Sequence, residues 1–143
     1  MAEIALGSIP IENIQPGMAI SYSQTITDAD IKAYAGLSGD HNPVHVSDDY
    51  ASSSRFGKRI AHGLMSAGFF SALFGTRLPG PGCVYVAQSL QFKRPVYMND
   101  TVVATVKVLS VDIGKSRVFF ETICTVGAKV VIKGEAEIYI PSK

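Results

Sequence analysis

The sequence lacks the features that mark a membrane, secreted or nucleic-acid-binding protein. Its longest apolar stretch, "LMSAGFFSALFG" at residues 64–75, is rich in Gly, Ala and Ser. It is also shorter than the roughly 20 apolar residues that cross a bilayer. The first residues lack the basic segment of a secretory signal, and 13 basic residues balance 12 acidic ones without any run of like charge. We therefore expect a cytoplasmic protein, with neither a membrane nor a nucleic acid as its partner.

Cysteine is scarce, which excludes a disulfide framework. Cys83 and Cys124 lie far apart, each in an apolar segment typical of a strand, so buried thiols are expected. No Ser/Gly/Pro-rich linker divides the chain. Because 143 residues suffice for one ordinary core, we expect a single domain spanning residues 1–143.

The hydrophobic pattern predicts helices in the first half of the chain. A strand over residues 18–26 leads to a helix that starts near Asp28, where Thr27 and Asp30 have the spacing of a capping box. This helix is expected to turn four apolar residues toward one face: Ile31, Tyr34, Ala35 and Leu37. A brief helix follows Ser47. The stretch after Gly63 carries apolar side chains around most of its circumference, which predicts a helix buried on nearly all sides.

From residue 83 onward the hydrophobic period changes to two. Residues 83–92, 101–111, 117–126 and 129–140 alternate as antiparallel strands do when one face of the sheet is covered. The helix starting near Gly63 is the one segment apolar enough to cover that face. The pattern thus predicts an α+β domain in which a sheet wraps around one central helix.

The octet "SGDHNPVH", residues 38–45, is the densest polar motif. His41 and His45 would share a face only on a helix, and Pro43 stands between them, so we expect no metal. Acid–base chemistry asks only that Asp40 and His45 reach the same atoms, and Pro43 can stiffen the loop between them and keep Asn42 extended. The alternative, in which Asp40 merely caps a turn and His45 is an ordinary polar residue, stays open.

Other chemistries have weaker support. "GLMSAG" is close to a nucleophile elbow, but its first glycine is one position too early and Ser66 falls within the predicted helix. The glycines of "GTRLPGP" lack the lysine of a phosphate-binding loop, and no G-x-G-x-x-G is present.

Taken together, the octet, "FGKRIAHGLMSAGFFSALFG", "LPGPGCVYVAQSLQFKRPV" and the last two strands resemble the MaoC-like hydratases. The resemblance is specifically to the short, single-domain (R)-specific enoyl-CoA hydratases of fatty acid and polyhydroxyalkanoate metabolism. It implies a hot-dog fold, a curved antiparallel sheet wrapped around a long central helix. It also implies a homodimer or dimer-based oligomer paired edge to edge, with the acyl-CoA in a tunnel near the interface. No metal or other cofactor is implied, since coenzyme A is part of the substrate.

The resemblance also implies site residues. Asp40 and His45 would be the catalytic pair that adds water across the double bond of a trans-2-enoyl thioester, giving an (R)-3-hydroxyacyl-CoA. Gly63 would bind the thioester carbonyl through its N–H group, which agrees with the partial positive charge of a helix N-terminus. Ser71 would support the site, and Phe74 would line the acyl pocket and limit chain length.

Several alternatives remain open in the sequence. The chain could act as a dehydratase on another acyl thioester, as an acyl-CoA thioesterase, or as a non-catalytic acyl-CoA-binding domain. His62 is expected to pack or to bond locally. Four basic residues lie where the phosphates of CoA could reach them, but none is assigned that role: Lys58, Arg59, Lys93 and Arg94.

Overall fold

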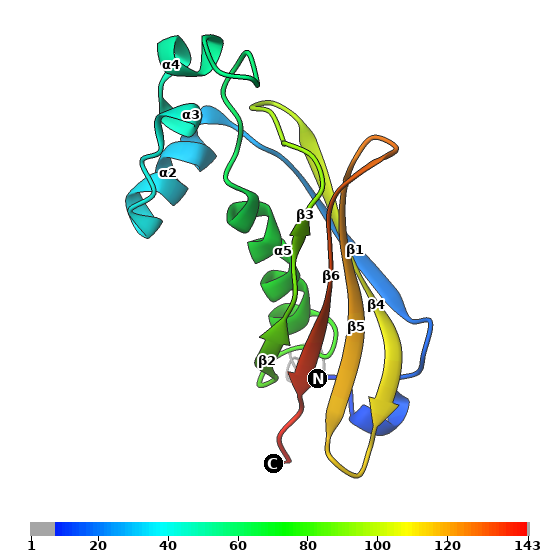
Figure 1. Ribbon diagram of the computed structural model, residues 1–143. Coiled ribbons are helices and arrows are strands. Elements are labelled where there is room, and N and C mark those ends of the chain that lie inside the picture. The colour runs from blue at the N-terminus through cyan, green and yellow to red at the C-terminus, as the bar shows by residue number, and fades with distance from the viewer. Residues whose placement is uncertain (1–7, 143) are drawn as a thin grey trace.

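The protein is built on one antiparallel sheet of six strands, with its longest helix packed against one face (Figure 1). The computed structural model describes residues 8–142. In spatial order the strands are β1 (Ala19–Thr25), β4 (Thr101–Asp112), β5 (Arg117–Val126), β6 (Lys129–Tyr139) and β2 (Val84–Gln88); the two-residue β3 (Gln91–Phe92) also pairs with β6. Because β1 and β2 each have one neighbour, they form the two edges of the sheet.

One long helix packs along the sheet, and three shorter helices form a separate group near the start of that long helix. A 3-10 turn at Ile11–Asn13 precedes β1. Between β1 and the long helix α5 (Gly63–Thr76) come α2 (Asp28–Ser38), α3 (Pro43–Val46) and α4 (Asp48–Ser52). Figure 1 shows these three together at the upper left, on the same side of the sheet as α5 and near the end where α5 begins. Within residues 8–142, no helix has both the length and the hydropathy to cross a membrane.

The core lies between α5 and the sheet, as the alternating pattern predicted. The inward side chains of β5 and β6 are all buried: Val118, Phe120, Thr122, Cys124, Ile132, Ala136 and Ile138. They meet Phe70, Leu73 and Phe74 of α5 in the same core. The α+β hot-dog architecture is therefore confirmed. Both thiols are free, and Cys124 is fully buried while Cys83 is half-buried.

Two local predictions are wrong. Leu37 is 87 % exposed, because it lies two residues after the buried Ala35 and so points to the opposite side of α2. The single strand expected over residues 83–92 is split into β2 and β3, which both pair with β6; between them the backbone of Ser89 approaches β6 closely. Gly134 permits this close approach, because a Cβ there would overlap the carbonyl oxygen of Ser89.

The sequence predicted that α5 is buried on nearly all sides, but one face of this helix is exposed. Leu64 at its start is 58 % exposed, and Gly68, Ser71 and Ala72 are exposed along the same helix. The reason is geometric, since the sheet of one chain covers only one side of a helix. This open face consists of small and apolar side chains.

Candidate active site

Asp40 follows α2 immediately after a sharp stop. Gly39 ends the helix in the left-handed conformation, with φ of 80°, where glycine avoids the strain that a Cβ would cause. The N–H of Asp40 donates to the hydroxyl of Ser38 at 3.1 Å, and its Oδ1 accepts the N–H of Asn42 at 3.1 Å. The first bond fixes the backbone of Asp40 and the second its carboxylate, while the residue remains exposed.

His45 lies on the single-turn helix α3, so the expected stiff loop ends at Asn42. Asn42 has the predicted extended backbone and caps α3, its Oδ1 accepting the N–H of Val44 at 3.2 Å. Pro43 takes the first helical position, where its missing N–H costs nothing and its fixed φ suits the helix. Proline therefore starts the helix that carries His45 and leaves the exposed His41 outside it.

The ring of His45 has a defined orientation. The residue is 8 % exposed, and its Nδ1–H donates to the carbonyl oxygen of Ile60 at 2.7 Å, because a carbonyl can only accept. In the neutral ring the lone pair is then on Nε2. Burial lowers the pKa of His45 below its usual value, and the nearby His62 acts in the same direction, against opposing effects of the Ile60 bond and Asp40. A neutral imidazole able to accept a proton near pH 7 is the result.

His62 joins the two members of the pair. It is 3 % exposed, its Nε2–H donates to the backbone carbonyl of Asp40 at 2.9 Å, and its ring stacks on that of His45 at 3.8 Å between centroids. Potential ligand atoms of Asp40, His45 and His62 all lie within 4.8 Å of one another. However, rings inclined by only 28° hold their lone pairs in nearly parallel planes, so they cannot converge tetrahedrally on one ion without rearranging.

The helix α5 begins at the same place. Its first N–H groups have no partner within the helix and carry its partial positive charge. A cavity of ≈ 230 Å³ brings these groups together with the acidic and imidazole side chains; its lining is Tyr34, Asp40, His45, His62, Gly63, Leu64 and Phe92. The arrangement can stabilise negative charge on a bound oxygen while Asp40 and His45 move protons.

Phe92 separates this cavity from a second one. Its ring, on β3, rests against Gly63 so closely that a Cβ on the glycine would lie 2.5 Å from it. The second cavity, of ≈ 320 Å³, shares His45, Gly63 and Phe92 with the first, and three basic residues also line it: Arg55, Lys93 and Arg94. The basic residues of the second cavity thus lie on the far side of Phe92 from Asp40.

The five predicted site residues are only partly brought together. Asp40, His45 and Gly63 share one cavity. Ser71 lies further along α5 and is exposed, whereas Phe74 is 1 % exposed and packs against Phe120 and Tyr85 in the core. Neither lines the two cavities, so their roles remain predictions.

Other residues of the site were not assigned from the sequence. Phe92 comes from a distant segment, and Tyr34 lies on the helix before Asp40; neither belongs to a motif that could have revealed it. His62 was expected to pack or to bond locally; it does pack, on the ring of His45, but its hydrogen bond reaches Asp40, 22 residues earlier. Arg59 is 6 % exposed and bonded within the protein, so it is not available to the phosphates of CoA. Ser66 is fully buried within α5, where no nucleophile is presented.

Comparison with known proteins agrees with this geometry. The MaoC like domain matches residues 12–134. The chain belongs to this family. It is 54 % identical to the (R)-specific enoyl-CoA hydratase of Rhodospirillum rubrum, over 92 % of both proteins. It is 41 % identical to the 3-hydroxybutyryl-CoA dehydratase of Methylorubrum extorquens, over 92 % of this chain and 84 % of that protein. These MaoC-like relatives are hydro-lyases.

The fold of this MaoC-like chain is also found in a solved hydratase structure. The (R)-hydratase of Aeromonas caviae involved in polyhydroxyalkanoate biosynthesis superimposes with a TM-score of 0.88 at 34 % identity. The superposition covers 91 % of this chain and 99 % of the other.

Proposed function

We propose that the protein catalyses the reversible hydration of trans-2-enoyl-CoA to (R)-3-hydroxyacyl-CoA. The observation that carries the proposal is the convergence of Asp40, His45 and the N-terminus of α5 on one cavity. The hydratase and the dehydratase to which the chain is similar act, by name, on CoA thioesters of this class.

Each part of the cavity has a role in this reaction. Asp40 and His45 hold a water molecule, whose oxygen forms a bond to C3 of the enoyl thioester. The pair removes one proton from this water and supplies one to C2, so that the elements of water add across the double bond. Gly63 N–H binds the thioester oxygen as negative charge builds on it. Because the two titratable groups are coupled, each proton belongs to the pair rather than to one residue.

The same proposal extends to the cofactor requirement, the oligomeric state and the metabolic role of the enzyme. The enzyme needs no metal or redox cofactor, because water addition to a polarised double bond requires only proton transfer and charge stabilisation. It acts as a homodimer in the cytoplasm. Its product suits fatty acid or polyhydroxyalkanoate metabolism, the latter being the process named for the Aeromonas caviae hydratase.

Loss of the conjugated thioester absorbance of crotonyl-CoA measures this activity directly. Asp40→Asn and His45→Gln each remove one proton-transfer group and should lower kcat by roughly 100-fold or more. His41→Gln is the matched control, because His41 is exposed, lies outside α3 and lines neither cavity. It should retain the parent rate.

The same assay separates the rival functions. If both dyad variants remain folded and keep parent-level activity, the proposed pair is wrong. Release of free thiol from an acyl-CoA would instead identify a thioesterase. Binding of enoyl-CoA without turnover would identify a binding domain.

A further inference from the structure

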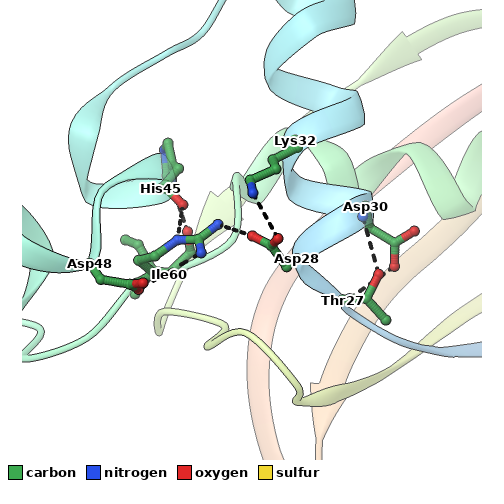
Figure 2. A network of polar contacts seen from close by, with 8 residues as sticks. Thr27, Asp28, Asp30, Lys32, His45, Asp48 and Ile60 are labelled. Atoms are coloured by element: carbon green, nitrogen blue, oxygen red, sulfur yellow. Dashed lines mark hydrogen bonds and ion pairs between the residues drawn. The ribbon is translucent and has the colours of Figure 1, made fainter.

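Arg59 is a buried cation that makes three polar contacts. It lies between α4 and α5 and is 6 % exposed. Its Nε–H donates to the backbone carbonyl of His45 at 2.6 Å, its Nη2 to Oδ1 of Asp28 at 2.6 Å, and its Nη1 lies 3.8 Å from Oδ1 of Asp48. Figure 2 shows these contacts as dashed lines to the labelled Asp28, Asp48 and His45. Burial of a guanidinium is expensive unless its donors are occupied in this way.

The acceptors lie on the elements that position the proposed pair. Asp28 is in the first turn of α2, and Asp40 comes two residues after the end of that helix. His45 is itself on α3, and Asp48 opens α4. One guanidinium therefore ties the helix before Asp40 to the helix that holds His45.

Asp28 is well suited to anchor this contact. Lys32, 2.9 Å away on the same helix, and then Arg59 hold the pKa of Asp28 below its usual value, so its carboxylate stays ionised. The capping box of Thr27 and Asp30 fixes the turn in which it lies. The anchor is thus part of a defined helix start rather than of a loose surface loop.

The residue after Arg59 continues the same attachment. Ile60 N–H donates to the carbonyl of Val44 at 3.2 Å, and Ile60 C=O accepts the Nδ1–H of His45 at 2.7 Å. Residues 59 and 60 consequently hold His45 twice, once by its backbone and once by its ring. Displacing this segment would release the bond that leaves the Nε2 lone pair for catalysis.

We propose that Arg59 is a positioning residue that sets the orientation of His45 relative to Asp40. The inference rests on the proposed roles of that pair. Arginine is required because its planar fork donates to a carbonyl and to a carboxylate in different directions, whereas the single ammonium of lysine cannot reach both. Arg59 touches neither cavity lining, so it acts through His45.

The kinetic test uses Arg59→Met and Arg59→Lys with crotonyl-CoA. Both should lower kcat by roughly 10-fold to 100-fold, because small misplacements of a catalytic group have effects of this size. KM should change by less than about threefold, since uniform substrate binding is retained. Arg59→Lys should keep a melting temperature close to the parent's, because it preserves the charge that pairs with Asp28. Parent-level kcat in a folded Arg59→Lys would overturn the inference.

Arg117→Met is the matched control. Arg117 is 32 % exposed and forms an ion pair with Glu137 at 2.9 Å, between β5 and β6 and outside the lining of both cavities. Its loss should affect stability while leaving kcat unchanged. A kcat reduced equally in Arg117→Met and Arg59→Met would show a general effect of destabilisation and contradict the positioning role.

A second measurement does not depend on catalysis. Imidazole nitrogen chemical shifts of histidine-labelled protein report which ring nitrogen carries the proton. The parent should show His45 as the Nδ1–H form, and Arg59→Met should show a mixture of the two tautomers. An unchanged Nδ1–H form in Arg59→Met would refute the inference. If the parent lacks hydratase activity, the proposed function fails, while these spectra still test the effect of Arg59 on His45.

Discussion

His45 is a single residue whose surroundings disfavour its charged form. Burial, and then the stacked His62, lower the pKa of His45 below its ordinary 6.5, so the unfolded chain binds this proton at a higher pH than the folded one. The free energy of unfolding should therefore fall as the pH drops from about 6.5 to the lowered value, and level off below it. Urea unfolding between about pH 7 and pH 5 should show a steeper loss of stability for the parent than for His45→Gln. Equal slopes would contradict this assignment.

At the same scale, the sequence predicts residues that lie in one motif and misses those that arrive from elsewhere. Asp40 and His45 are five residues apart, and Gly63 marks a helix start, so local patterns suffice to find them. Arg59 looks like an exposed base in the sequence, because only the folded chain shows Asp28 and the His45 carbonyl around it. Phe92 reaches Gly63 across 29 residues, a contact that no spacing rule contains.

Among the elements, β6 depends on a glycine at one position. A Cβ on Gly134 would overlap the backbone of Ser89, where the chain passes from β2 to β3. Gly134→Ala should therefore lower the free energy of unfolding by roughly 2–3 kcal/mol, as overpacking does when the neighbour is backbone. Gly36→Ala in α2 is the control, because nothing lies within 4 Å of its Cβ position and alanine favours helix by roughly 0.5–1 kcal/mol. Urea unfolding measures both, and equal stability of the two variants would disprove the close approach of Ser89 to Gly134.

The elements that were predicted well have strong periodic patterns. The start of α2, β4, β5 and β6 agree with the sequence because capping and alternation are local signals. The helix α3 and the break between β2 and β3 were not predicted. A four-residue helix has no period to detect, and the close approach of Ser89 to Gly134 joins residues that are far apart in the sequence.

The whole molecule has an edge and a helix face that one chain does not cover. In the part of the chain that the structure describes, β2 pairs only with β6, and its Val84 and Val86 are 47 % and 44 % exposed. Leu64 and Phe92, also exposed, line the cavity of Asp40 and His45. A second subunit that added its own β2 strand here would bury these side chains and help enclose the substrate.

A charged residue on this edge should therefore prevent the proposed dimer. Val86→Lys places an ammonium group on β2, and sedimentation should show the mass of the parent to be twice the 15.3 kDa chain and that of the variant to be one chain. The hydratase activity of Val86→Lys should also fall, because the monomer lacks the second subunit that helps to enclose the substrate. Ser23→Lys puts the same charge on β1, the opposite edge, and should leave the dimer intact. Dissociation by Ser23→Lys but not by Val86→Lys would place the interface on β1 instead.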